Sequence, residues 1–192
     1  MKWTIQKLPR YHELEATIAP DGAASAAGEV LATRVQRHVL RASSTRHKTA
    51  SRLGATPTGH LSEGAANIRM EKAGANAVVV VPIPGIERAF GDMHVRPRKA
   101  RALTIPINAV AYGVRAPELA DRGWSLFTLS AKQGPGAGIL FGRKARMKSA
   151  VALYLLRRSA DIPQDRELMP SDEEMGEAMA YGVAMEIERT RA

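Results

Sequence analysis

The first regular hydrophobic pattern in the chain has a helical period, with apolar side chains at every fourth position. Leu31, Val35 and Val39 follow this spacing within residues 25–40, while the charged residues fall mostly on other faces. This pattern predicts an amphipathic helix. A segment rich in Ser, Thr, Gly and basic residues follows over 42–60 and predicts a long loop.

A second helix is expected from Ser62, which can cap its first turn, to Lys72, with Gly74 at its end. Its large apolar residues are Ile68 and Met70 alone. The prediction therefore rests on the cap and the glycine rather than on hydrophobic periodicity.

The middle of the chain changes to patterns that are typical of β-strands. Ala77–Val81 is an uninterrupted apolar run, which suits a strand covered on both faces. Leu103–Ile107 alternates apolar with other residues and contains Pro106, which places this strand at an edge or a bulge. Three further apolar segments are spaced for an antiparallel meander with loops longer than tight hairpins: Leu126–Leu129, Ile139–Phe141 and Val151–Leu156.

The element that the sequence specifies best is a C-terminal helix. Ser171 can cap its start and Glu174 can return a hydrogen bond, which is the arrangement of a capping box. Apolar side chains at four-residue spacing then form a stripe along the helix: Met175, Met179, Val183 and Ile187. We expect this stripe to be a packing face, against the chain's own sheet or against a neighbouring subunit.

Together these patterns predict an α+β fold, in which an antiparallel sheet of about five strands packs with an N-terminal and a C-terminal helix through long loops. Residues 1–28 form a segment of unclear role, and 29–192 are expected to be one domain ending in the C-terminal helix. The chain has no cysteine, which excludes disulfides and cysteine-based catalytic or zinc sites. It shows no secretory signal and no apolar run long enough to cross a bilayer, so synthesis in a cytoplasm is expected.

The formal net charge of +9 is unevenly distributed along the sequence. Residues 1–160 hold 25 basic and 10 acidic side chains, a balance of +15. Residues 161–192 hold 3 basic and 9 acidic side chains, a balance of −6. Such asymmetry is typical either of a nucleic-acid-binding body with an acidic tail or of complementary faces that meet between subunits.

The sequence carries no recognisable catalytic motif. The glycine-rich segment 134–138 is followed by a strand pattern, where a nucleotide-binding loop requires a helix. None of the five histidines has a second histidine at metal-ligand spacing. The acidic run Asp172–Glu174 is already explained by the capping box. We therefore expect a chain that is not an enzyme and that binds no cofactor and no metal.

Three clusters of basic residues fall in predicted loops. The first contains Arg46, Lys48 and Arg52. The other two are the candidate contacts to a channel or a partner: Arg96, Arg98, Lys99 and Arg101, then Arg143, Lys144, Arg146 and Lys148. Loops gathered on one side would make a positive rim. No aromatic residue lies among the clustered arginines, so the stacking platforms typical of single-strand readers are missing, and packing against an acidic partner fits equally well.

Several stretches of the sequence serve as a fingerprint rather than as chemical motifs. They are Arg46–His60, Pro84–Asp92, Arg96–Ile107 with Ala111–Gly113, and Leu153–Leu156 through Ile162–Asp172. These stretches resemble the phage virion morphogenesis family, the tail-completion proteins of Mu-like phages and their prophages. The similarity runs from about Glu29 to the C-terminus and leaves residues 1–28 unmatched. It names no active residues.

The resemblance implies a virion protein of the neck or tail, assembled in the host cytoplasm. Such a subunit forms a ring, expected to be a hexamer, at the head-proximal end of the tail and enables head–tail joining. Its partners would be further copies of itself, neighbouring neck and tail-tube proteins and, without sequence preference, passing phage DNA, with no membrane involved. Opposed charges could supply the two different faces that a ring requires. The alternative is a basic DNA-binding accessory or packaging protein of a phage or prophage.

Overall fold

The computed structural model describes residues 2–4, 20–46, 48–130 and 137–191, and contacts divide the chain into two compact units. Unit 1 comprises Met1–Arg46, Gly59–Gly91 and Gln164–Ala192, and unit 2 comprises His47–Thr58 and Asp92–Pro163. The expectation of one domain over 29–192 stays a prediction, and its span includes parts of both units. Hydrophobic periodicity reports local elements, and it does not report which distant segments share a core.

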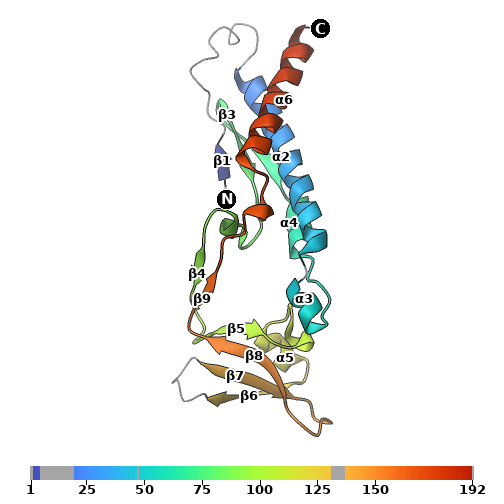
Figure 1. The fold of residues 1–192 in the computed structure, drawn as a ribbon, viewed down its shortest axis with the longest axis vertical. Coiled ribbons are helices and arrows are strands. Elements are labelled where there is room, and N and C mark those ends of the chain that lie inside the picture. The colour runs from blue at the N-terminus through green and yellow to red at the C-terminus, as the bar shows by residue number, and fades with distance from the viewer. Residues whose placement is uncertain (1, 5–19, 47, 131–136, 192) are drawn as a thin grey trace. The chain divides into compact units, whose positions relative to one another are not determined.

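Unit 1 is built on two long helices that lie side by side, α2 (Pro20–Thr45) and α6 (Asp172–Arg191) (Figure 1). The helices run antiparallel, because Gly22 at the start of α2 lies against Glu186 near the end of α6, whereas Arg34 bonds Glu174 in the first turn of α6. The helix expected over 25–40 is confirmed and extends further at both ends. Because α2 begins at Pro20, part of the N-terminal segment set apart in the sequence belongs to this helix.

A three-stranded antiparallel sheet completes unit 1, with the strand order β1-β3-β2. The strands are β1 (Lys2–Thr4), β2 (Arg69–Ala73) and β3 (Asn76–Val80). β3 confirms the strand expected over Ala77–Val81, and its residues alternate between buried and partly buried positions. Two short 3₁₀ helices lie in the same unit, η1 (Ile86–Ala89) and η3 (Arg166–Leu168).

The helix expected from Ser62 to Lys72 is wrong in its second half. Helix α4 (His60–Ala66) is capped by Gly59 and ends at Ala66, after which the chain enters β2. Gly74, with φ +62°, sits in the turn of the β2–β3 hairpin instead of closing a helix. Pairing with the strongly β-forming strand β3 outweighs the weak helical signal, since this signal had little periodic support.

The core of unit 1 gathers apolar residues from all three of its chain segments. The α2 stripe of Leu31, Val35 and Val39 is at most 3% exposed. It packs in one cluster with buried residues of β3, of the 3₁₀ helices, of α6 and of the connections beside them: Val79, Val81, Ile83, Ile86, Leu168, Met169 and Met175 among others. The stripe predicted from the sequence thus forms the centre of this unit.

Unit 2 contains a four-stranded antiparallel sheet with the order β5-β8-β7-β6. Its strands are β5 (Leu103–Pro106), β6 (Ser125–Ser130), β7 (Gly138–Arg143) and β8 (Val151–Arg157). The last three form the expected meander, and β5 lies at an edge, as Pro106 indicated. A separate two-stranded ribbon pairs β4 (Met93–Val95) with β9 (Ala160–Ile162).

One face of the four-stranded sheet carries the core of unit 2. Leu153 and Tyr154 of β8 are buried with Trp124 and with Leu119 of helix α5 (Ala116–Asp121). The Tyr154 hydroxyl donates a hydrogen bond to the carbonyl of Val114 at 2.7 Å. Two short helices complete the unit, α3 (Lys48–Leu53) within the segment expected to be a loop and the 3₁₀ helix η2 (Ala109–Ala111).

The α+β class is therefore confirmed, with a long N-terminal helix, a C-terminal helix and antiparallel strands. Within the described residues the strands form three sheets, of three, two and four strands, instead of one sheet of about five. Within the same residues, no helix combines the length and apolar character needed to cross a membrane.

Candidate assembly surfaces

The two units differ sharply in charge. Unit 2 contains 15 basic and 4 acidic residues, a formal balance of +11. Unit 1 contains 13 basic and 15 acidic residues, a balance of −2. The excess positive charge seen in the sequence therefore belongs to one folded body rather than to everything that precedes residue 161.

The second basic cluster lies in the connection between β4 and β5. Arg96, Arg98, Lys99 and Arg101 are all exposed. Arg96 donates from Nε to Nε2 of His94 at 3.0 Å, and His94 Nδ1 faces Asp161 at 2.5 Å. The Arg96 contact uses Nε2 as an acceptor, so the neutral His94 tautomer with its hydrogen on Nδ1 satisfies both neighbours. Arg96 is thus anchored at the end of the β4–β9 ribbon.

The third basic cluster lies at the β7–β8 connection. Arg143 ends β7, and Lys144, Arg146 and Lys148 follow it before β8 begins, all four exposed. The Lys144 ammonium lies over the ring of Trp124, 5.4 Å from its centroid, which is a cation–π contact.

The two clusters begin from opposite ends of the four-stranded sheet. The first residue of β5, Leu103, pairs with Arg157 at the end of β8, whereas the β7–β8 connection enters β8 at Val151. The seven residues of β8 separate these ends by about 20 Å. The antiparallel register therefore separates the starting points of these two loops, whereas a single positive rim would require loops gathered on one side.

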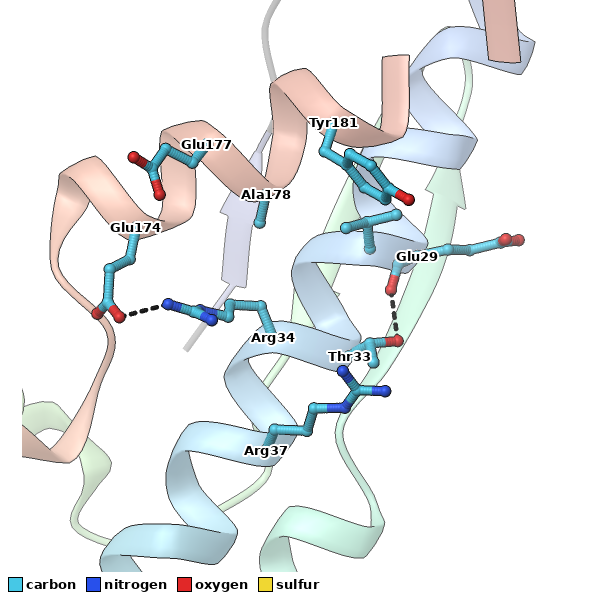
Figure 2. Close-up of a pocket in the computed structure, with 9 residues that line it drawn as sticks. Glu29, Thr33, Arg34, Arg37, Glu174, Glu177, Ala178 and Tyr181 are labelled. Carbon is cyan, nitrogen blue, oxygen red and sulfur yellow. Dashed lines mark hydrogen bonds and ion pairs between the residues drawn. The ribbon is translucent and has the colours of Figure 1, made fainter. Parts of the chain in front are cut away.

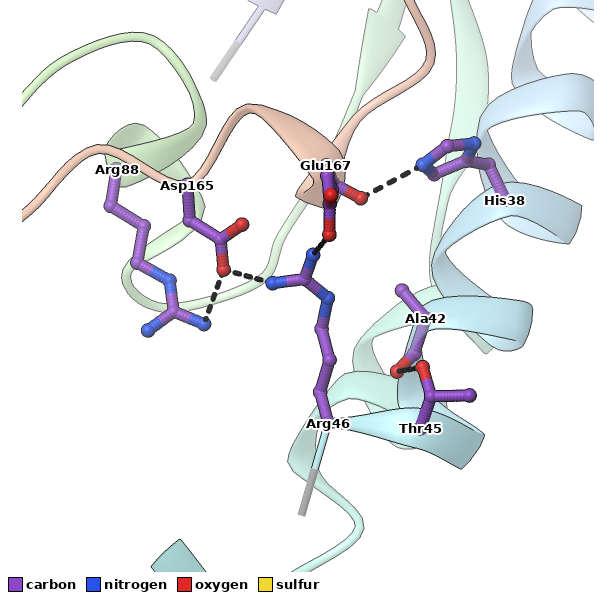
Figure 3. A network of polar contacts seen from close by, with 7 residues as sticks. All are labelled: His38, Ala42, Thr45, Arg46, Arg88, Asp165 and Glu167. Atoms are coloured by element: carbon purple, nitrogen blue, oxygen red, sulfur yellow. Dashed lines mark hydrogen bonds and ion pairs between the residues drawn. The ribbon is translucent and has the colours of Figure 1, made fainter. Parts of the chain in front are cut away.

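The first basic cluster is divided between the units, and its first residue, Arg46, forms ion pairs. Arg46 follows α2 in unit 1 and contacts Asp165 and Glu167, the latter at 2.8 Å (Figure 3). Asp165 also lies 3.6 Å from Arg88, and the Glu167 carbonyl bonds His38 at 3.0 Å. The contacts hold the segment before α6 against α2 and η1. Lys48 and Arg52 belong to α3 of unit 2 and are exposed.

The predicted stripe on α6 faces its own unit. Met175 is 6% exposed, and Met179 packs against the same core. Val183 and Ile187 are partly buried further along the helix. The first half of the stripe thus follows the intramolecular alternative, and the side of α6 that is open to solvent carries other residues.

An open groove of about 560 Å³ runs between α2 and α6 (Figure 2). Arg34 spans it to reach Glu174, and Glu29, Arg37, Glu177 and Tyr181 line it. Tyr181 is 62% exposed, and Met185, one helical turn further, is 50% exposed. Glu177 and Glu188 flank this pair at helical spacing, so Glu177, Tyr181, Met185 and Glu188 form one side of the helix, here called the helix face.

A second exposed apolar surface lies on the four-stranded sheet of unit 2. Strand pairing places Phe127 opposite Phe141 and Leu129 opposite Ile139, which is itself opposite Leu155. These five residues form the sheet face, on the side away from the core of unit 2. Phe127 and Leu129 are 42% and 59% exposed, and the Phe127 and Phe141 rings stack with centroids 6.0 Å apart.

Neither the sheet face nor the helix face is among the surfaces predicted from the sequence. A usable signal was present for the sheet, since Leu126–Leu129 and Ile139–Phe141 carry apolar residues on both alternating sides. Such runs indicate strands covered on both faces, yet among the described residues of unit 2 the buried cluster lies on one face alone. For α6, Tyr181 and Met185 lie outside the predicted stripe and give a second, shorter apolar pair.

A scan against protein-family models and searches of curated proteins and solved structures found no match to this chain. Among the residues that the structure describes, no group of three or more His, Asp or Glu side chains is placed to hold a metal ion.

Proposed function

We propose that this chain is a structural protein of a tailed-phage virion that forms a ring at the head-proximal end of the tail and enables head–tail joining. It acts by binding copies of itself and neighbouring neck and tail proteins rather than as an enzyme. The ring is a hexamer, in keeping with the family that the sequence resembles. This function is performed in the virion after assembly in the host cytoplasm.

The observation that carries the proposal is the division of charge between two compact units, +11 in unit 2 and −2 in unit 1. A ring is a heterologous assembly, so each subunit must present two different surfaces that fit each other. Two folded bodies of unlike charge on one chain meet this requirement, because the basic body of one copy attracts the acidic elements of the next.

The sequence resemblance gives independent support. Three of the stretches that carry it, Arg46–His60, Pro84–Asp92 and Ile162–Asp172, supply the ion pairs around Asp165 in unit 1. These residues position the segment that leads into α6. The residues that carry the resemblance thus make contacts that hold the fold together, which agrees with a role in assembly.

The basic DNA-binding accessory protein is the second candidate, and the net charge of +11 on unit 2 is the observation that favours it. All eight candidate contact residues of unit 2 are exposed and accessible to phosphate groups. The two candidates differ in whether free protein selects a DNA sequence.

Electron microscopy of the purified chain, alone and mixed with isolated tails that lack it, tests the ring. We expect rings in solution or an added layer at the head-proximal end of the tail, followed by attachment of filled heads. The same tails without added protein are the control. A chain that stays monomeric and also leaves tails uncapped and unjoined contradicts the proposal.

A further inference from the structure

We propose that the sheet face of unit 2 in one copy of the chain docks on the helix face of α6 in a second copy. The inference rests on the proposed ring and names the two surfaces by which neighbouring subunits contact each other.

The sheet face combines exposed apolar area with positive charge at its margins. Phe127 and Leu129 are 42% and 59% exposed, which is unfavourable in water for large apolar side chains grouped on one surface. Arg143 pairs with Ser125 and therefore points to the same side as Phe127. Arg157, two residues beyond Leu155 on β8, shares this side at the opposite end of the sheet. Both arginines are exposed.

The helix face has the same organisation with the opposite charge. Tyr181 and Met185 are 62% and 50% exposed and lie one turn apart on α6. Glu177 lies one turn before Tyr181 and Glu188 about one turn after Met185, and both are exposed. Across the groove, Arg37 of α2 lies with Glu29 (Figure 2), and Arg189, one turn after Met185, is paired with Glu186 at 2.6 Å. The negative charge of the face therefore comes from Glu177 and Glu188.

The two faces are therefore complementary in both respects that define an interface. Each has an apolar centre that gains from burial and a charged rim that is exposed to solvent, as protein interfaces generally do. The rim is arginine on the sheet face and glutamate on the helix face, so their contact brings opposite charges together.

Comparing the possible pairings of the two faces indicates which face each one binds in a second copy. Two helix faces in contact would bring Glu177 and Glu188 against carboxylates of the same kind, and two sheet faces would bring arginine against arginine. Like charges across an interface disfavour both symmetric pairings. A contact of unlike faces remains, and since every copy carries one of each, this contact can repeat from copy to copy. It gives the proposed ring when the rotation between neighbouring copies closes.

The absence of cysteine from the chain makes a direct test available. Leu129→Cys is made in a chain with one tag and Met185→Cys in a chain with a different tag. A disulfide-linked product that carries both tags can then form only between copies. Both positions are exposed, and the substitutions leave the cores intact. Ala180→Cys, which is exposed on α6 outside the helix face, is the matched control. The mixtures are oxidised mildly, both in solution and in the presence of isolated tails.

We expect the Leu129→Cys and Met185→Cys pair to give several-fold more mixed disulfide than Leu129→Cys with Ala180→Cys. Adding Arg143→Glu to the first chain should lower this yield, and adding Glu177→Arg to the second should restore it. Equal yields for the two pairs, both in solution and on tails, overturn the proposal. Tails that are capped and joined despite equal yields would leave the ring intact and reject only this interface. An enriched disulfide in a chain that never joins tails would support this interface and contradict the proposed function.

Discussion

The guanidinium of Arg46 donates a hydrogen bond at 2.8 Å to the carboxylate of Glu167, a residue 121 positions further along the chain. It also pairs with Asp165, which Arg88 approaches from a third segment (Figure 3). These contacts lie where α2 ends and shortly before α6 begins. They fix the entry of α6, and with it the helix face, on the core of unit 1.

Replacing Arg46 by Ala should therefore destabilise unit 1. The side chains of Arg46 and Asp165 are 20% and 25% exposed, so the pair is intermediate between an exposed and a buried ion pair. We expect the free energy of unfolding to fall by about 1–3 kcal/mol. Urea denaturation measures this change. Arg41→Ala, an exposed position one turn earlier on α2, is the control and should change stability by less than about 0.5 kcal/mol.

Two glycines of α6 should respond in opposite directions to substitution by Ala. A Cβ on Gly182 would lie 2.6 Å from the carbonyl oxygen of Ala26 and 2.8 Å from the Cα of Ala27, both backbone atoms that cannot rotate away. A Cβ on Gly176 would meet nothing within 4 Å.

Gly182→Ala should therefore force α2 and α6 apart and cost about 1–3 kcal/mol of stability. Gly176→Ala should stabilise the chain by roughly 0.5–1 kcal/mol, because alanine is the better helix former. Thermal melts of the two variants beside the parent chain are sufficient. Similar shifts of the same sign would contradict the close helix contact.

The elements that could be predicted from the sequence are those specified by neighbouring residues. The capping box of α6 forms as expected: the Ser171 N–H donates to Glu174 at 3.1 Å, and the Glu174 N–H donates to the Ser171 hydroxyl at 3.2 Å. The α2 stripe and the three-strand meander of unit 2 were likewise found from their local periods.

Features that depend on distant partners could not be predicted in the same way. Residues 69–73 form β2 because they pair with β3. Arg46 belongs to an ion-pair network because Asp165 and Glu167, far along the chain, lie beside the end of α2. The exposed sheet face depends on which side of the sheet α5 covers, and no local pattern specifies this choice. The eight candidate contact residues of unit 2 lie in or beside the connections where the sequence predicted loops, but their distribution over two ends of a sheet required the strand register.

The capping box should also make stability depend on pH. The hydrogen bond from the Ser171 backbone, with further help from Arg34, lowers the pKa of the Glu174 carboxyl below its ordinary value. A carboxyl with a lowered pKa in the folded state stabilises the fold fully above the ordinary glutamate value of about 4.3. This contribution is lost as the pH falls through the lowered folded pKa.

Glu174→Gln should consequently be less stable than the parent chain at neutral pH, and the two should converge in acid. Denaturant titrations at a series of pH values measure the difference, with Glu173→Gln on the same turn as the control. Ser171→Ala removes the reciprocal bond and should cost about 1 kcal/mol. A constant difference between the Glu174 variant and the parent across the series would argue against the ionised capping box.

The apolar stripe of α6 should not tolerate charge. Met179 packs against the core of unit 1 and Val183 is partly buried, so aspartate at both positions would place carboxylates among apolar side chains. We expect Met179→Asp with Val183→Asp to lose cooperative unfolding and all tail completion. Ala180→Asp, at an exposed position of the same helix outside the helix face, is the control. A folded double variant that still completes tails would show that the stripe is dispensable.

The basic residues of unit 2 separate the two candidate functions. In a neck protein, Arg96–Arg101 and Arg143–Lys148 face a channel or a partner, and free protein should bind duplex DNA weakly and without sequence preference. Affinity should fall steeply with salt, because counterion release is then the only large contribution to binding. An accessory DNA-binding protein should instead hold a particular sequence at physiological salt.

A salt series of binding to a set of defined and random duplexes decides between them, together with Arg96→Ala, Arg98→Ala and Lys144→Ala scored for infectious particles. Each variant removes one exposed cation, although Arg96 also loses its contact with His94 and Lys144 its contact with Trp124. Arg98→Ala, for which no such contact is described, therefore reports charge most directly. Weak, unselective binding combined with fewer joined heads and tails in these variants supports the neck role. Tight binding that prefers one duplex, with the preference lost in the same variants, would establish the accessory DNA-binding protein instead, because phosphate contacts alone carry no sequence information.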